Sequence, residues 1–312
     1  MFGFFEGKSW DASDIPDLTG RIAIVTGGNT GLGLVTVREL ARHGARVYML
    51  SRNESKAITA IDEIKNEIPE ANVEFIHFDL QSLKSAKQAA ESFLAKEDRL
   101  DILVNNAAIM AVPYQLSEDG IELQACNGTG HVALTLPLLP VLKRTASEPN
   151  SRVRIVNITS IAARVAHKPD FTNLDTLNRP FWITGVRYAN SKLFNMLFTN
   201  ELQKRLEGTR IYCLSVHPGV ISTDIWLGLN QSWPWLSPLH AIRRRLMLTP
   251  YQGALTQLYA ATSPEVEAKD LKAAYLVPVG KVGNKPSLGE DKKGELGKGF
   301  MDLCEKLIAK NS

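Results

Sequence analysis

Short apolar runs alternate along this chain with segments whose apolar residues recur every three or four positions. The apolar runs, which are typical of buried strands, occupy residues 21–26, 46–51, 73–79, 100–105, 152–160, 210–217 and 273–279. Helical periodicity occupies residues 32–43, 54–67, 82–96, 117–143, 186–206 and 250–262. Strands without a polar face, separated by helices, indicate a parallel sheet covered on both sides. We therefore predict one α/β domain over residues 1–312, a Rossmann-type doubly wound parallel sheet of about seven strands with helices on both faces.

Three long stretches interrupt this alternation. Residues 161–185 follow one strand, residues 221–249 follow another and contain Trp226, Trp233 and Trp235, and residues 280–299 are rich in Gly and Lys. Long irregular segments of a compact domain are commonly functional, and ligands of open α/β sheets bind beyond the carboxyl ends of strands. We interpret 161–185 as a substrate loop, 221–249 as a lid and 280–312 as a C-terminal tail.

The composition of the chain bears on whether it binds nucleic acid or a membrane. The 312 residues carry a net charge of +3, and the basic residues are scattered, which argues against nucleic acid. No apolar run approaches the roughly 20 residues of a transmembrane helix. Phe2, Phe4, Phe5 and Trp10 predict an N-terminal aromatic arm packed on the domain surface, with a weak membrane contact as the alternative.

The cysteines set the expected compartment. Cys126, Cys213 and Cys304 stand singly, without the spacing of a disulfide framework or a zinc site. We therefore expect no metal and a reducing, cytoplasmic location.

A glycine-rich stretch joins the first predicted strand to its helix. It reads Thr-Gly-Gly-Asn-Thr-Gly-Leu-Gly, from Thr26 to Gly33. Gly27 permits a tight turn, Gly31 lets the backbone approach a pyrophosphate, and Gly33 allows close packing. A helix N-terminus offers free N–H groups and a positive dipole end to phosphate. The stretch predicts a dinucleotide loop, and a merely structural turn is the alternative.

The residues at the end of the second predicted strand distinguish an NAD site from an NADP site. An NAD site usually has an acidic residue there for the ribose 2′-OH, whereas this chain has Ser51 and Arg52. The charge and donor fork of Arg suit a 2′-phosphate, so we predict NADP(H). The alternatives are that Arg52 is a solvated helix-start residue or that Glu54 contacts the ribose.

Tyr188 and Lys192 carry the candidate chemistry. They stand four residues apart in Tyr-Ala-Asn-Ser-Lys, on one face of a predicted helix. A fixed cation near a phenol favours the phenolate, so we expect Lys192 to lower the pKa of Tyr188. Ser160 ends the fifth predicted strand and can donate to a substrate oxygen. The alternative for Tyr188 and Lys192 is an ordinary surface pair, and Ser160 alone could be a turn residue.

Six motifs stand in one order along residues 18–280. They are Thr26-Gly27-x3-Gly31-x-Gly33, Asp79-Leu80, Asn105-Asn106-Ala107-Ala108, Ser160, Tyr188-x3-Lys192, and His217-Pro218-Gly219 with Thr223. In this order the chain resembles the short-chain dehydrogenase/reductase family. The 28 residues from Ser160 to Tyr188 resemble the longer spacing of its retinol-dehydrogenase-like and WW-domain-oxidoreductase-like branches and of fungal short-chain reductases.

The resemblance implies a set of site residues. The catalytic residues would be Ser160, Tyr188, Lys192 and Asn127, the last holding a water in a relay to Lys192. The stretch Gln124-Ala125-Cys126-Asn127 is one residue shorter than expected, so Asn127 is either in register or misplaced by about 100° of helix rotation. The cofactor would contact Thr26, Gly27, Asn29, Thr30, Gly31, Leu32, Gly33, Ser51, Arg52, Asp79, Leu80, Asn106, Ala107, Tyr188, Lys192, Pro218, Gly219, Val220 and Thr223.

Together these features predict an NADP(H)-dependent alcohol dehydrogenase or ketoreductase that interconverts a carbonyl and an alcohol on a small molecule. The tryptophans of 221–249, with Phe171, Phe181 and Trp182, favour a lipophilic or aromatic substrate, although some of these aromatics are equally expected in the core. The alternative is a non-catalytic NADP(H)-binding regulator on the same scaffold. A homodimer and a monomer both remain open.

Overall fold

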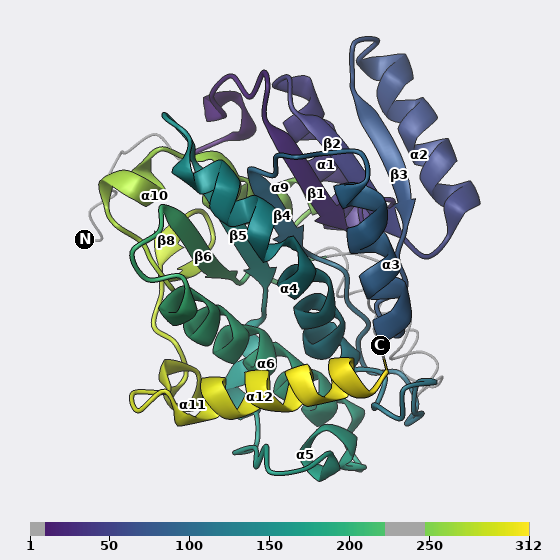
Figure 1. Cartoon of the computed structure of the whole chain (residues 1–312), viewed down its shortest axis with the longest axis vertical. Helices are drawn as coiled ribbons and strands as arrows, with labels where there is room; N and C mark the ends of the chain where they lie inside the picture. Colours follow the sequence, from purple (N-terminus) through teal and green to yellow (C-terminus); the bar gives the residue numbers. More distant parts are fainter. Residues whose placement is uncertain (1–9, 222–246, 312) are drawn as a thin grey trace.

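The computed structural model describes residues 10–221 and 247–311, and these residues contain an eight-stranded sheet (Figure 1). Its order is β3-β2-β1-β4-β5-β6-β7-β8, and every neighbouring pair is parallel except β7 and β8. The order reverses between β1 and β4, which confirms the predicted doubly wound sheet. The strands are β1 (Ile22–Thr26), β2 (Arg46–Ser51), β3 (Val73–His77), β4 (Ile102–Asn105), β5 (Val153–Ile158), β6 (Ile211–Val216), β7 (Tyr275–Val277) and β8 (Lys281–Val282).

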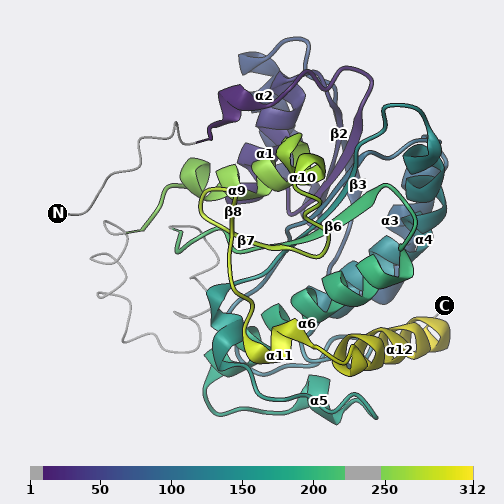
Figure 2. The same ribbon diagram turned by 90° about the vertical axis from the view of Figure 1, so that its left-hand side faces the viewer.

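Helices cover both faces of the sheet (Figure 2). One face packs against α1 (Gly31–Arg42), α2 (Glu54–Glu67) and α9 (Pro250–Thr262), and the other against α3 (Leu83–Leu94), α4 (Cys126–Ser147) and α6 (Thr184–Arg205). The described residues also form shorter helical segments. They are η1 (Ala12–Asp14), η2 (Ile161–Val165), α5 (Asp175–Asn178), α10 (Glu265–Ala268) and α11 (Ser287–Glu290).

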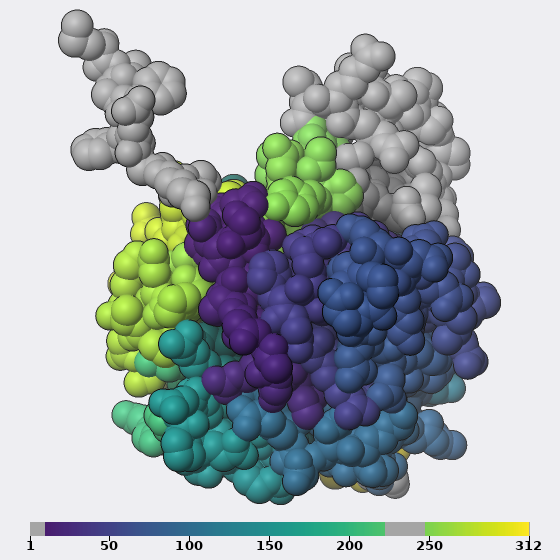
Figure 3. Space-filling model, turned by 90° about the horizontal axis from the view of Figure 1, so that it is seen from above, coloured from purple at the N-terminus to yellow at the C-terminus, as the bar shows by residue number. Residues whose placement is uncertain are grey.

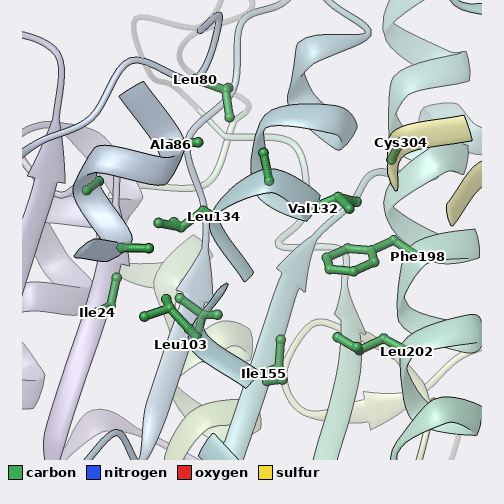
Figure 4. Packing of buried hydrophobic residues seen from close by; sticks show 14 of the residues in the cluster. Ile24, Leu80, Ala86, Leu103, Val132, Leu134, Ile155, Phe198, Leu202 and Cys304 are labelled. Atoms are coloured by element: carbon green, nitrogen blue, oxygen red, sulfur yellow. The ribbon is translucent and has the colours of Figure 1, made fainter. Parts of the chain in front are cut away.

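The strands are apolar on both sides because each side meets a helix layer. In β1, Ile24 faces the layer of α3, α4 and α6, whereas Ala23 and Val25 face the layer of α1, α2 and α9. Successive side chains of a strand alternate between faces, so two buried faces require a continuous apolar run. Figure 4 shows the first of these cores, where strand residues Ile24 and Leu103 lie toward the side chains of the covering helices.

The prediction of a helix from residue 117 is wrong, because α4 begins at Cys126. Residues 117–122 instead form a turn, with a bridge between Leu116 and Glu122. Gly120 has φ of +72° in this turn, a conformation that glycine adopts at little cost. The apolar residues before Cys126 suggested helical period, but this turn prevents a helix there.

The end of the chain is more regular than the predicted tail. It contributes the eighth strand, β8, and a helix, α12 (Glu295–Lys310), that lies across α4 and α6 (Figure 1). Phe300, Cys304 and Leu307 of α12 are buried in the core. Their helical spacing was visible in the sequence, but the Gly- and Lys-rich stretch before them obscured it.

The first described residues pack on α9. The rings of Trp10 and Tyr259 meet edge to face with centroids 5.6 Å apart, and the Tyr251 hydroxyl donates to Asp11 at 3.0 Å. Figure 3 shows the N-terminal segment beside α9 on this face. Phe2, Phe4 and Phe5 of the expected aromatic arm lie outside the described residues.

Within the ranges 10–221 and 247–311, no helix is both long and apolar enough to cross a membrane.

Replacing Phe300 with Ala tests whether α12 is part of the core. Phe300 is fully buried, with its ring stacked on Phe194 at 5.2 Å between centroids. The cavity and the lost apolar contact predict a loss of about 3–5 kcal/mol in the free energy of unfolding, measured by urea denaturation. Ile58→Ala on the exposed face of α2 serves as the control and should change it by about 0.5 kcal/mol or less. Equal losses in the two variants would show that α12 adds little to the core.

Candidate active site

The glycine loop lies between the carboxyl end of β1 and the first turn of α1. Gly27 has φ of +63°, and a Cβ on Gly33 would lie 2.1 Å from the Gly27 carbonyl oxygen. No side chain larger than hydrogen fits at Gly33 without opening the loop. The N-cap residue Thr30 makes no side-chain hydrogen bond to the first turn. The N–H groups of that turn are therefore free to meet an anion.

Asn106 and Ala107, at the carboxyl end of β4, hold this loop in place. The Thr26 hydroxyl accepts hydrogen bonds from the backbone N–H groups of both residues, each with an N–O distance of 2.9 Å. The side-chain amide of Asn106 donates to the Thr26 carbonyl oxygen at 2.8 Å. The loop is thus fixed to β4 at the point where the strand order reverses.

A cleft of about 510 Å³ runs from the glycine loop across the ends of β2 and β3. Its glycine backbone, its open helix end and its basic side chains suit a dinucleotide. Lys56, in the first turn of α2, also lines the cleft, although the sequence reasoning did not identify it. Its spacing of four residues from Arg52 was the available signal. Of the predicted cofactor residues, the cleft is lined by Gly27, Asn29, Thr30, Gly31, Leu32, Ser51, Arg52, Asp79, Leu80, Asn106 and Ala107.

A second pocket, of about 340 Å³, adjoins this cleft and shares Leu32, Asn106, Ala108 and Met110 with it. Ser160, Tyr188 and Lys192 line it together with His217, Pro218, Gly219 and Val220. The structure thus brings three of the four predicted catalytic residues beside predicted cofactor residues, whereas Asn127 does not line the pocket. The rest of its wall is mostly apolar; the sequence reasoning named none of these residues individually, although it assigned Ile161 and Ala162 to the substrate loop and Ile221 to the lid. The residues of this apolar wall are Met110, Ala111, Ile158, Ile161, Ala162 and Ile221.

Tyr188 and Lys192 project from α6 toward the end of β5. Ser160 forms a hydrogen bond with the Tyr188 side chain, and the Lys192 ammonium lies 5.5 Å from the centre of the Tyr188 ring. The ammonium donates to the Ile158 carbonyl oxygen at 2.9 Å. The Thr159 hydroxyl donates to the Lys192 carbonyl oxygen at 2.7 Å, which ties α6 to β5 directly beside the pocket.

Burial dominates the ionisation of both groups. It raises the pKa of Tyr188 to about 12, opposed by the hydrogen bond with Ser160, and lowers the pKa of Lys192 to about 7. The pKa of Tyr188 is therefore raised and not lowered as expected, because desolvation of the phenolate is the largest contribution. At neutral pH the phenol keeps its proton.

Asn127 lies in the first turn of α4, and its side chain connects two other elements. Its amide nitrogen donates to the Ile109 carbonyl oxygen at 2.9 Å and to the Ser191 hydroxyl at 3.0 Å. Its amide oxygen accepts the Ile109 N–H at 2.9 Å. The contact with Ser191 directs the Asn127 side chain toward α6, the helix that carries Tyr188. Its role in a proton relay stays a prediction.

Part of the expected site falls outside the described residues. Thr223 and the three tryptophans of the expected lid belong to this part. In the substrate loop, Trp182 is 89% exposed and Phe181 stacks on His167 with ring centroids 4.8 Å apart. Phe171 instead packs on Phe194 of the core.

Lys192 predicts a distinctive pH dependence of stability. Its pKa is about 7 in the folded chain against 10.5 in the unfolded chain, so between these values only the unfolded chain holds the extra proton. The free energy of unfolding contributed by this group therefore rises as pH increases from 7. The free energy of unfolding of wild type minus that of Lys192→Met, from denaturation at pH 7, 8 and 9, should therefore increase with pH, because Met does not titrate. The opposing effect of Tyr188 begins only above about pH 10. Parallel curves for the two proteins would contradict the burial of an uncharged lysine.

Comparisons with known proteins agree with this site. The short chain dehydrogenase family model matches residues 21–172. An uncharacterized oxidoreductase of Schizosaccharomyces pombe is 43% identical over 285 residues, covering 88% of this chain and 81% of the relative. Mouse retinol dehydrogenase 12 is 39% identical over 254 residues, covering 80% and 76%. The crystal structure of an uncharacterized protein from Mycobacterium paratuberculosis superimposes with a TM-score of 0.72 at 30% identity, covering 96% and 98%. The chain belongs to the short-chain dehydrogenase/reductase family, a family of oxidoreductases that bind NAD(P).

Proposed function

We propose that this protein is an NADP(H)-dependent oxidoreductase that interconverts a carbonyl and an alcohol on a lipophilic or aromatic small molecule. The observation that carries the proposal is that a cleft and a pocket adjoin each other at the carboxyl ends of the strands. One is the dinucleotide cleft, and the other is the apolar pocket that contains Ser160, Tyr188 and Lys192. A substrate in the pocket would meet a cofactor in the cleft.

Carbonyl reduction adds a hydride to carbon and a proton to oxygen. A bound nicotinamide supplies the hydride. Tyr188 is the proton donor in this direction, because its phenol stays protonated at neutral pH. In the oxidation direction its phenolate accepts the proton of the alcohol. The Ser160 hydroxyl donates to the substrate oxygen and stabilises the negative charge that develops there.

In its protonated form, Lys192 assists the phenolate that proton transfer creates. Its ammonium is held beside the Tyr188 ring by the Ile158 carbonyl oxygen. A cation at this distance in a buried site lowers the free energy of the phenolate once it forms. By resemblance to the family, Lys192 also binds the nicotinamide ribose.

The cofactor specificity rests on charge at the adenosine end of the cleft. Arg52 and Lys56 both line the cleft beside Ser51, and no acidic side chain occupies the end of β2. Two cations at this point favour the 2′-phosphate of NADP(H) over the free hydroxyl of NAD(H).

The substrate class follows from the wall of the catalytic pocket. Met110, Ile161 and Ile221 offer hydrocarbon contact, while Ser160 and Tyr188 are the polar groups placed for the reacting oxygen. Around the pocket, Ile161 and Val220 are about half exposed, so the apolar surface extends to the pocket mouth. The resemblance to a retinol dehydrogenase, whose name indicates an apolar alcohol, supports this class.

Tyr188→Phe should abolish turnover while NADPH binding is kept. The substitution preserves the ring and removes only the proton that is transferred, so we expect at least about a hundredfold loss of kcat. The measurement is NADPH consumption or NADP⁺ reduction on a panel of lipophilic and aromatic carbonyls and alcohols, with binding followed by NADPH fluorescence.

Tyr251→Phe is the matched control, because that hydroxyl contacts Asp11 away from the pocket. Full turnover by Tyr188→Phe would exclude the proposed mechanism. Tight NADPH binding by the wild type without turnover of any panel member would favour the non-catalytic regulator.

Arg52→Glu should reverse the preference for NADPH over NADH. It replaces a phosphate-binding cation with an acceptor for the ribose hydroxyl, and we expect the ratio of the two kcat/KM values to fall by about a hundredfold. Lys56→Glu should shift the ratio in the same direction. Lys87→Glu, on the exposed face of α3, applies the same charge change away from the cleft and should leave the ratio unchanged. A ratio that stays constant in Arg52→Glu would reject the assignment to NADP(H).

A further inference from the structure

His131 is a buried residue of α4 that the proposed reaction does not use. Its side chain makes a hydrogen bond at each ring nitrogen. Nε2 lies 2.9 Å from the Thr26 hydroxyl, and Nδ1 lies 2.9 Å from the Asn127 carbonyl oxygen. The ring also stacks on Phe78, with centroids 6.2 Å apart. His131 therefore touches the glycine loop on one side and the first turn of α4 on the other.

The partners determine which ring nitrogen carries the proton. The Asn127 carbonyl oxygen can only accept, so Nδ1 must be the N–H donor. The Thr26 hydroxyl already accepts two backbone N–H groups, those of Asn106 and Ala107, and has one proton left to donate. Nε2 of His131, at 2.9 Å, is closer to that hydroxyl than the Val104 carbonyl oxygen at 3.5 Å. Nε2 is thus an acceptor, and the ring is neutral with its proton on Nδ1.

A protonated ring would not fit this arrangement. It would direct an N–H at a hydroxyl whose lone pairs are occupied. Burial, opposed by the hydrogen bond to the Asn127 carbonyl and assisted by the positive charge of Lys192, lowers the pKa of His131 to about 3. His131 therefore keeps one protonation state and one tautomer across the working range of pH, which makes it a fixed connector and not a proton carrier.

The connection continues from Asn127 to the helix that carries Tyr188. The Asn127 amide donates to the Ser191 hydroxyl at 3.0 Å, and that hydroxyl donates to the Tyr188 carbonyl oxygen at 2.8 Å. A continuous series of hydrogen bonds thus joins Thr26 at the end of β1 to Tyr188 on α6. It passes through the interior, so water does not compete with its members.

We propose that His131 is a positioning residue that holds the dinucleotide loop at Thr26 in register with the catalytic helix through Asn127. Hydride transfer depends on the distance between two sites that lie on different elements, the cofactor cleft and Tyr188. A displacement of about 1 Å between them is enough to cost a hundredfold in rate. A rigid, doubly bonded imidazole at the centre of α4 restrains that distance.

The tautomer can be tested without cofactor or substrate. In the ¹⁵N spectrum of the histidine side chains, the signals absent from His131→Gln identify His131. The proposal expects an Nδ1–H tautomer that does not titrate between pH 5 and pH 8. An Nε2–H tautomer, or a titration in this range, would overturn it.

The positioning role is tested with His131→Phe, which keeps a ring and removes both hydrogen bonds. We expect kcat at saturating NADPH and substrate to fall by about tenfold to a hundredfold, and the dissociation constant of NADPH to rise several-fold. Thr135→Val is the matched control. It removes a buried hydrogen bond from the same helix, that of Asn105 to Thr135 at 3.2 Å, without touching the series from Thr26 to Tyr188.

Thr135→Val should lower the unfolding temperature and leave kcat within about twofold of wild type. His131→Asn, which can keep the bond to the Asn127 carbonyl but not reach Thr26, should lose most of the same activity, and it replaces His131→Phe if that variant does not fold. A kcat within twofold of wild type in the variant used, or an equal loss in Thr135→Val, would overturn the proposal. The kcat measurements rest on the proposed function, whereas the measurements of the His131 tautomer and of NADPH binding do not. The positioning role and the proposed function can therefore fail separately.

Discussion

The functional arrangement depends on one constraint of a parallel sheet, namely that the carboxyl ends of its strands meet at a single edge. In this chain the strand order reverses between β1 and β4, and the crossovers on either side leave a crevice at that edge. Thr26 ends β1, and its hydroxyl accepts hydrogen bonds from the backbone N–H groups of Asn106 and Ala107, just beyond β4. Asn106 of this junction lines both the dinucleotide cleft and the adjoining pocket of Tyr188.

Burial then sets the chemistry of the groups around the crevice. Tyr188 and Lys192 lie where the charged form of each is disfavoured, so the pKa of the phenol rises and that of the ammonium falls. The same low polarity gives weight to hydrogen bonds that would contribute little in water. For this reason the bonds of Ile158 and Thr159 to Lys192 position α6.

Several features were predictable because they depend on local sequence. The glycines of the loop follow from close backbone contacts, as Gly33 and the Gly27 carbonyl oxygen illustrate. The strands were recognised because both faces of the sheet are covered by helices, so each strand is a continuous apolar run without alternating polar residues. The start of α4 was not, because the apolar residues before Cys126 carry a helix-like period while the left-handed Gly120 turns the chain. The helix of Phe300 was also missed, because the Gly- and Lys-rich stretch before it obscured its helical spacing.

The sequence by itself determined the fold class, the dinucleotide loop and the pairing of Tyr188 with Lys192, because each depends on periodicity or on spacing within a few residues. Only the tertiary structure decided the direction of the Tyr188 pKa, the contribution of Lys56 to the cleft and the two hydrogen bonds of His131. These depend on desolvation and on contacts between elements separated by many residues. Neither quantity is encoded in local spacing, since both arise when the helices close over the sheet.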